Sequence, residues 1–529
     1  MSEGRPEGED SPLEEVGPVG LPPEAAGVGG EAEISTALGE PPGEPGPPPG
    51  ERRVVAARGM VINSGFFLAL GTLQLLKAVI VARFLSPTEF GIWAILFLAF
   101  GLVFALKNVA VGNKYIQQDE ADQEAAFQKA FTLELCAAVA TTALMCALAP
   151  LLALVYDEDR MLAPALVLAL TLPGLALQAP AWVYYRRMAF LRQRLIAAVD
   201  PIVGFVLTIA LAAAGLDYWS LVIGLVAGAW AGGIVAVAAS PYRLALRFER
   251  ATLREYVSFS TPLIVAVAAG LTIAQLSVLF GDLAIGLAGA GAIGLAATFA
   301  AYVDRMDAVI TQTLYPAICR VRDRADLMLE AFLKSNRLAL MWAVPLGVGL
   351  SLFSGELIEF VIGEQWRRAE ILLVVFGLTA AISHVGFNWV AFYRAIGDTR
   401  PEAVVTVGVM LVFLLVATPL LFAYELEGFA IGTAAMAVAA VAGRWYYVKR
   451  LFPQLRVLRY FIRAFAPTAL AAGAVLALRL ALGGEATLGL ALAELALYLI
   501  VNAAVTIALE RPLITEALSY LRSPAPRPA

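Results

Sequence analysis

The sequence predicts an all-α polytopic membrane protein with about 14 transmembrane helices, arranged as two pseudo-symmetric six-helix lobes plus two C-terminal helices. Three observations predict this fold class: an apolar composition, recurring apolar runs long enough to cross a bilayer, and charges whose sign alternates between successive connections. Of the 529 residues, 60% are hydrophobic and 15% are charged, and the mean hydropathy is +0.77. Soluble globular domains are less apolar, so lipid is the expected solvent.

The N-terminal segment differs from the rest of the chain. Residues 1–50 are rich in Pro and Gly and hold eleven Asp or Glu against one Arg. Such a segment buries too little apolar surface to offset its chain entropy, so we predict that residues 1–56 form a disordered, acidic, cytoplasmic tail. No basic stretch followed by a short apolar region and a cleavage site precedes the first span, so that span is expected to act as the insertion signal.

Apolar runs of roughly 20 residues, the length that crosses about 30 Å of hydrocarbon as a helix, follow one another from residue 60 to 509. In the first half we predict spans at 60–82, 91–111, 130–155, 161–183, 195–215, 218–240 and 257–280. In the second half we predict spans at 290–315, 337–355, 369–393, 402–423, 427–448, 461–482 and 487–509. The corresponding domains are an N-lobe at 57–248, a C-lobe at 249–452, two extra helices at 453–510 and a cytoplasmic C-terminal tail at 511–529.

The connections between these spans alternate in charge. Arg and Lys gather in every second connection, for example in YYRRMAFLRQR at 184–194. The opposite connections carry mostly acids, with these basic exceptions: Arg83, Arg160, Arg367 and Arg368. Cytoplasmic loops are enriched in Lys and Arg, so both termini are predicted to lie in the cytoplasm of a multi-pass protein in a bacterial cytoplasmic (inner) membrane.

An internal repeat relates the two halves. A shift of about 203 to 206 residues places Phe90-Gly91-Ile92 on Ile293-Gly294-Leu295, and 184–194 on 392–400, in line with a parallel repeat. Six spans separate equivalent helices, and an even number preserves their orientation in the membrane. The repeat therefore predicts two six-helix lobes around an axis along the membrane normal.

A family resemblance rests on three motifs. ARFLSPTEFGIWAI at 82–95 resembles the hallmark of the polysaccharide transporter (oligosaccharide flippase) family, and LYPAICRVRDR at 314–324 and AIGDTRPEAV at 395–404 are similar to further family motifs. Ser86 stands where that family usually has Gly. The family is a branch of the multidrug, oligosaccharidyl-lipid and polysaccharide exporter superfamily. Members resemble one another in having two six-helix lobes around a central cavity and in working by alternating access.

The resemblance implies a flippase for a polyprenyl-(pyro)phosphate-linked oligosaccharide, serving exopolysaccharide, O-antigen or capsule biosynthesis. The expected partners are this lipid-linked substrate, membrane lipids and other polysaccharide assembly proteins, with no nucleic acid and no cofactor. In structural terms, the hallmark is a short connection in which Pro87 ends one helix and Ser86 and Thr88 are able to cap the next. Gly91 then permits close packing of the second span.

Cations inside spans are the first candidate site residues, because a charge near the bilayer centre costs about 2.5 to 3.5 kcal/mol. The resemblance implies that helices one, two, seven and eight line the cavity. Lys77, Lys107 and Arg305 are therefore candidate ligands for the anionic headgroup. Another interpretation remains open: the two lysines extend to the membrane interface, and Arg305 neutralises a neighbouring aspartate.

Uncharged and acidic residues form a second group, with coupling or cavity roles: Asp200, Asp304, Asp307, Gln275 and His384. Asp200 precedes Pro201 near the start of a span, where the sequence favours a helix cap over a coupling carboxylate. His384 is the single histidine, and either titrates during transport or packs with a hydrogen bond. Gln275 suits either sugar hydroxyls or contacts between helices.

An enzyme is not expected. A membrane glycosyltransferase or polymer ligase needs an extramembrane segment with catalytic acids or histidines, whereas the predicted connections reach only about 20 residues and carry no glycine-rich phosphate loop or metal-ligand spacing. Two transporters remain as alternatives to the oligosaccharide flippase: a cation-coupled drug or metabolite exporter of the same superfamily, and a flippase for the peptidoglycan precursor.

Overall fold

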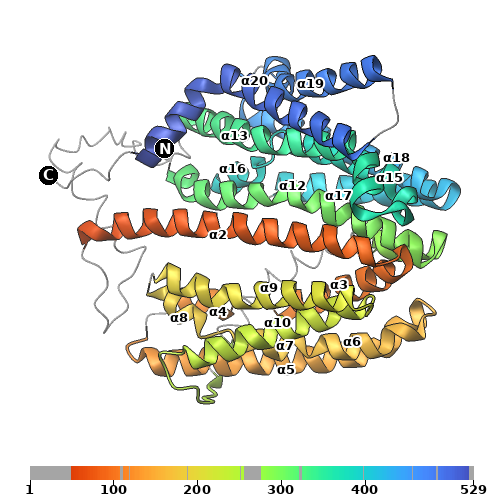
Figure 1. Ribbon diagram of the computed structural model, residues 1–529. Coiled ribbons are helices and arrows are strands. Elements are labelled where there is room, and N and C mark those ends of the chain that lie inside the picture. Colours follow the sequence, from red (N-terminus) through yellow and green to blue (C-terminus); the bar gives the residue numbers. More distant parts are fainter. Residues whose placement is uncertain are drawn as a thin grey trace, which may run out of the picture.

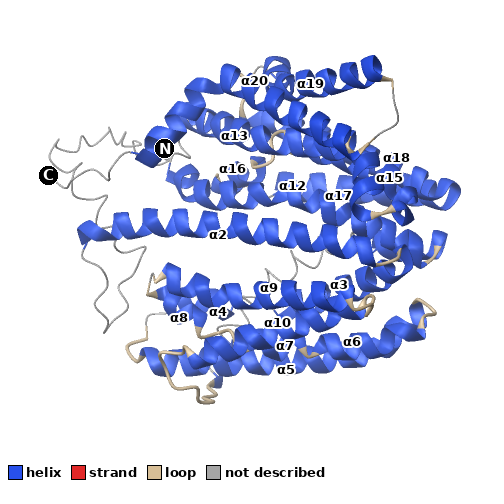
Figure 2. Cartoon of the chain, in the orientation of Figure 1, coloured by secondary structure: helices blue, strands red, loops and turns tan. Residues whose placement is uncertain are grey.

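The computed structural model describes residues 49–107, 111–117, 120–187, 189–250, 252–254, 276–320, 324–396, 398, 400–455, 457–483 and 487–522. Over these residues the protein is built from helices and holds no strand (Figure 2), which confirms the all-α prediction. The predicted tail at 1–56 lies mostly outside the described residues, and α2 already begins at Pro49.

The N-terminal half contains α2 (Pro49–Phe84), α3 (Pro87–Lys107), α4 (Val111–Gln117), α5 (Gln123–Val155), η1 (Asp159–Met161), α6 (Leu162–Ala169), α7 (Thr171–Ala176), α8 (Ala181–Arg186), α9 (Phe190–Ala213) and α10 (Trp219–Ala238). The C-terminal half contains a helix at Leu276–Ile285, α12 (Leu287–Arg320), α13 (Ala325–Leu352), α14 (Ser354–Glu356), η2 (Leu357–Ile362), η3 (Glu364–Ala369), α15 (Glu370–Ser383), α16 (Trp389–Ala395), α17 (Arg400–Val412), η4 (Phe413–Ala417), α18 (Thr418–Leu451), α19 (Val457–Leu482) and α20 (Leu488–Arg522). Every predicted span except 257–280 falls on these helices, and most of that one lies outside the described residues.

The longest apolar helical stretch, Arg400–Leu451, is two spans joined by a tight turn. It is 52 residues long, far more than one crossing needs. Tyr424 and Glu425 leave the helical conformation, with Glu425 at φ 52°. A Cβ on Gly428 would collide with the carbonyl of Leu420, so the chain folds back on itself there. This hairpin matches the predicted spans 402–423 and 427–448.

The hallmark connection between α2 and α3 is a capping box. The Ser86 amide donates to the Glu89 carboxylate at 2.7 Å, and the Glu89 amide donates to the Ser86 hydroxyl at 3.3 Å. Pro87 occupies the first helical position, where its missing N–H costs nothing. The serine that departs from the family pattern therefore starts the second span, as its capping chemistry predicts.

The N-lobe comprises α2 to α10, and the C-lobe comprises α12 to α20. In Figure 1, the N-lobe helices α4 to α10 lie below α2 and the C-lobe lies above it, and α2 packs on α9, α12 and η2. The two lobes meet where α3 crosses α12. We call the end of the bundle with the connections 156–160 and 363–370 the acidic end, and the end with 184–194 the basic end.

The crossing of α3 and α12 is built on two glycines. A Cβ on Gly91 would collide with the carbonyl of Leu287, and a Cβ on Gly291 would collide with the carbonyl of Pro87. Each glycine thus contacts the residue that lies four positions before the other glycine. Such a reciprocal pattern is expected around a local two-fold axis. The contact pairs Gly91 with Gly291, about one helical turn before the Gly294 that the sequence shift matches to Gly91.

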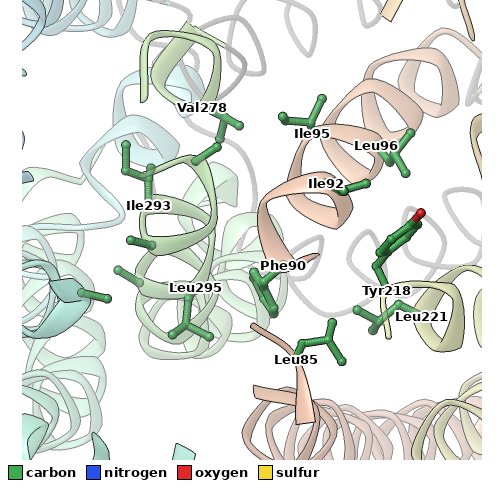
Figure 3. Packing of buried hydrophobic residues seen from close by; sticks show 14 of the residues in the cluster. Leu85, Phe90, Ile92, Ile95, Leu96, Tyr218, Leu221, Val278, Ile293 and Leu295 are labelled. Carbon is green, nitrogen blue, oxygen red and sulfur yellow. The ribbon is translucent and has the colours of Figure 1, made fainter. Parts of the chain in front are cut away.

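Apolar packing between the lobes concentrates at the acidic end. The largest buried cluster joins residues of both lobes, including Leu85, Phe90, Ile293 and Leu295 (Figure 3). Two further clusters, around Phe127 in the N-lobe and around Phe332, Phe392 and Phe452 in the C-lobe, each stay within one lobe. Among the described residues, the lobes are thus sealed against each other mainly at the acidic end.

Ion pairs attach the last two helices to the C-lobe. Glu510 of α20 accepts from Arg337 of α13 and from Arg463 of α19, the latter at 3.1 Å. Near the opposite end, Arg479 of α19 contacts Glu356 at 2.5 Å and Glu494 at 2.9 Å. The Glu510 and Glu494 side chains are only 6% and 4% exposed, so these charges depend on their partners.

Candidate functional site

A buried tryptophan of the C-lobe closes the acidic end. Trp366 is 1% exposed, and its indole N–H donates to the carbonyl of Ala82 at 2.8 Å. Its ring meets Phe90 edge to face, with centroids 5.4 Å apart. The neighbouring Gln365 side chain also donates to the Ala82 carbonyl, at 3.3 Å. We call residues 363–369, which hold these contacts, the closing turn.

A polar cluster inside the N-lobe unites two residues that the sequence singled out separately. The Gln178 amide donates to Asp200 at 2.9 Å and to the carbonyl of Ala229 at 3.3 Å. The Lys77 ammonium on α2 interacts electrostatically with the Asp200 carboxylate on α9. The candidate cation thus lies near enough for its charge to act on the candidate carboxylate, and we call Lys77, Gln178 and Asp200 the Lys77 cluster.

Two backbone features make room for this cluster. The fourth span is interrupted between α7 and α8, and Gln178 lies in that break. A Cβ on Gly228 would lie 2.8 Å from Asp200 Oδ1, and one on Gly232 would lie 2.8 Å from the Gln178 amide nitrogen. Gln178 was missed from the sequence; the proline that follows it and the two glycines one turn apart on α10 are the signals that mark the place.

The helix-cap interpretation of Asp200 is wrong. Helix α9 begins at Phe190, so Asp200 lies well inside it, where no backbone N–H is left unpaired by a helix start. Pro201 is likewise inside the helix. The carboxylate instead uses the Gln178 amide and the Lys77 charge as partners.

The candidate cations occupy different depths. Lys77 lies seven residues before the acidic end of α2 at Phe84, and Arg305 lies eighteen residues after the start of α12 at Leu287. A rise of 1.5 Å per residue places them about 10 Å and about 27 Å from the acidic end. Lys107 is the last residue of α3, about 30 Å from its start, and its side chain lies outside the described part of the structure.

The backbone of the remaining α12 candidates is described, but their side chains are not: Asp304 and Asp307, like Arg305, belong to this helix. Gln275 lies outside the described residues. The structure therefore does not test where the α12 charges lie relative to Lys77 and Asp200. Nor does it test the interpretation in which Arg305 neutralises a neighbouring aspartate.

His384 lies in a break of the C-lobe, between α15 and α16. It is 1% exposed, and its Nδ1 lies 2.7 Å from the carbonyl of Ala380. Since a carbonyl only accepts, Nδ1 carries the hydrogen. This burial and hydrogen bond support the packing interpretation. His384 follows Gln178 by 206 residues, so the breaks in the two lobes occupy equivalent places in the repeat.

Side chains from two neighbouring helices satisfy the backbone at this C-lobe break. Asn336 donates to Asn388 at 2.7 Å and accepts from the amide of Gly386 at 2.5 Å. Arg444 of α18 donates to the carbonyls of Ser383 and Val385. Interrupted helices require such partners in a membrane. Arg444, which the sequence assigned to a basic connection, is therefore part of the bundle interior.

The arginines of 184–194 also have structural partners. Arg186 donates to the carbonyls of Tyr115 and Ile116 at the end of α4, at 2.9 and 2.8 Å. Arg194 lies over the ring of Phe66 of α2, 5.2 Å from its centroid. These contacts hold the basic end of the N-lobe together. Within the described part of the chain, no group of three or more His, Cys, Asp or Glu is placed to hold a metal ion.

Comparisons with known proteins give a family and a fold. The profile of the family described as polysaccharide biosynthesis protein matches residues 80–370, which is more than half of the chain. No curated protein sequence matches the chain significantly.

Solved transporters share the architecture. The lipid II flippase MurJ in an inward closed conformation superposes with a TM-score of 0.65 and 14% identity, over 86% of this chain and 100% of that one. An inward-facing multidrug resistance MATE family transporter of the MOP superfamily gives a TM-score of 0.57 and 13% identity, over 75% of this chain and 99% of that one. Because the sequence identities are only 14% and 13%, these similarities establish the fold alone. The chain is thus a polytopic membrane protein that belongs to the polysaccharide biosynthesis protein family and has the fold of MOP superfamily transporters.

Proposed function

We propose that this protein is a flippase that translocates a polyprenyl-(pyro)phosphate-linked oligosaccharide across the bacterial cytoplasmic membrane by alternating access. The family supports a role in polysaccharide biosynthesis, and the two-lobe fold supports transport. The observation that carries the proposal furthest is the hydrogen-bonded Gln178–Asp200 pair inside the N-lobe, on which the charge of Lys77 acts, beneath a closure made by both lobes.

The mechanism begins with the acidic end closed. By the positive-inside rule the basic end faces the cytoplasm, with both termini on that side, so the headgroup enters from there while the prenyl chain stays in lipid. Arg305 lies nearer the entrance and Lys77 nearer the closure, so a headgroup meets the two cations in succession. At Lys77 the phosphate replaces Asp200 as the counter-charge, since a buried ammonium needs an anionic partner in both states.

Reopening to the outside requires the closing turn to leave α2. The Trp366 contacts with Ala82 and Phe90 cross from one lobe to the other, so rocking of the lobes breaks them. Asp200 then recovers Lys77 once the substrate has left. Gln178 keeps the carboxylate in place throughout the cycle through its bond to the Ala229 carbonyl.

A second candidate is a cation-coupled drug or metabolite exporter. It is favoured by Asp200, a carboxylate inside the N-lobe that a proton or metal cation is able to occupy. A flippase for the peptidoglycan precursor shares the polyprenyl-pyrophosphate chemistry, and the likeness to MurJ keeps it as an alternative.

The proposal is tested by deleting the gene and measuring polyprenyl-linked intermediates by mass spectrometry, with complementation. We expect a lipid-linked oligosaccharide to accumulate, and the wild-type gene to restore the baseline. Lys77→Gln should fail to restore it, whereas Lys334→Gln, which removes an exposed lysine paired with Glu330, should succeed. No accumulation together with altered drug or metabolite efflux would favour the exporter, and accumulation of lipid II alone would favour the peptidoglycan precursor.

A further inference from the structure

An open cleft of about 740 Å³ lies at the acidic end of the C-lobe, apart from the Lys77 cluster. It lies between the start of α15 and the hairpin turn of α18. The polar side chains that line it are Arg367, Arg368, Glu370, Tyr424, Glu425 and Glu427. Its volume falls in the range of about 300 to 1,000 Å³ that small-molecule sites occupy.

The charges lining the cleft largely neutralise one another. Arg367 contacts Glu364 at 2.5 Å and Glu370 at 3.4 Å, and Arg368 contacts Glu425 at 2.6 Å. Guanidinium and carboxylate groups paired in this way still present hydrogen-bond donors and acceptors to a ligand. They exert little net field, so an uncharged ligand rich in hydroxyl groups suits the cleft better than a phosphate or a metal ion.

The hairpin turn adds an aromatic face and a strained backbone. Tyr424 is 63% exposed, so its ring is available for the apolar face of a sugar. Glu425 adopts φ 52°, a left-handed conformation that is uncommon for residues other than glycine, asparagine and aspartate. Strain of this kind persists where the surroundings enforce it, and it clusters at functional sites. Here it directs the Glu425 carboxylate to Arg368 across the cleft.

We propose that this cleft binds the sugar units of the translocated oligosaccharide on the outer side of the membrane. The inference rests on the proposed function and deepens it by giving the glycan its own site. Arg367 and Arg368 directly follow Trp366 in the closing turn, so the cleft and the closure between the lobes share one short segment of backbone. A sugar bound in the cleft contacts the segment that must move when the acidic end opens.

The test uses the full-length protein in lipid nanodiscs. The probe is the oligosaccharide released by mild acid from the polyprenyl lipids of the host, and its contact with the protein is measured by saturation-transfer difference NMR. We expect Tyr424→Ala and Arg368→Ala each to weaken binding by about fivefold or more. The Arg368–Glu425 pair is exposed, so its loss should leave the fold intact, which size-exclusion profiles will verify.

Arg160→Ala is the matched control. Arg160 lies at the same end in the other lobe, is 54% exposed, and pairs with Glu158 at 2.7 Å. This control should bind the oligosaccharide as the wild type does. An absent signal for the wild type, or equal signals for all variants, would overturn the cleft proposal. The flippase proposal is judged separately by lipid accumulation in the deletion strain, so a strain that accumulates the intermediate while the purified protein shows no sugar contact refutes the cleft alone.

Discussion

Removing the indole of Trp366 should release the closure between the lobes. The side chain contributes one hydrogen bond to Ala82, worth about 0.5 to 1.5 kcal/mol, and one aromatic pair with Phe90, worth about 0.5 to 1.5 kcal/mol. Both contacts cross from one lobe to the other. Trp366→Ala should therefore shift the equilibrium toward opening of the acidic end by about 1 to 3 kcal/mol, or about 5- to 150-fold.

A conservative variant separates the two contributions. Trp366→Phe keeps an aromatic ring beside Phe90 but loses the donor, so we expect a shift of only about 2- to 13-fold. Trp342→Ala is the control, because Trp342 is 38% exposed on α13 and belongs to neither closure contact.

The assay is a distance measurement by electron spin resonance between labels at Arg160 and Glu364, exposed positions of the two lobes at the acidic end. The population at long distance should grow in the order wild type, Trp366→Phe, Trp366→Ala. An unchanged distance distribution in Trp366→Ala would refute the assignment of the closing turn.

Two further predictions concern packing and buried charge. Gly91→Ala should destabilise the protein by about 1 to 3 kcal/mol, because the new Cβ collides with a backbone carbonyl of α12. The control Gly101→Ala should be neutral or slightly stabilising, because Gly101 has open space around it. Thermal unfolding in detergent measures both variants, and equal melting temperatures would contradict the glycine crossing. Glu510→Gln should lower stability by about 1 to 3 kcal/mol because two arginines lose their shared carboxylate, while the exposed Glu330→Gln should change it by less than about 0.5 kcal/mol. If Glu510→Gln unfolds at the wild-type temperature, α19 and α20 are not held by this ion pair.

The sequence was sufficient for the parts of the fold that depend on local pattern. Apolar run length gave the spans, since each helix must cross the same hydrocarbon thickness. Capping chemistry gave the start of α3 at Ser86. The repeat was detectable because the starts of equivalent helices and the basic connections are similar in both halves.

The candidate site depended on contacts between helices, which no local pattern encodes. Lys77 and Asp200 were each conspicuous as charges in apolar spans, but their association follows from the packing of α2 on α9. Gln178 sits in an apolar run and carries no charge, so only the break in its helix marks it. Arg367 and Arg368 were exceptions to the charge alternation, and the structure accounts for them through carboxylate partners at the acidic end.

The sequence does not indicate the role of Trp366, for a different reason. An aromatic residue beside charged residues in a connection is typical of a membrane interface, where one side of the ring contacts lipid and the other water. Only the docking of the C-lobe on the end of α2 buries it and gives its N–H a partner.

Reconstitution tests the flippase activity most directly. Purified protein is incorporated into proteoliposomes with the lipid-linked oligosaccharide isolated from the deletion strain, and translocation is followed by the fraction of glycan that becomes accessible to a membrane-impermeant oxidant. Wild-type protein should expose the inner-leaflet pool, Lys77→Gln should expose it much more slowly, and Lys334→Gln should equal the wild type. Exposure by wild-type protein no faster than in protein-free liposomes would contradict the flippase.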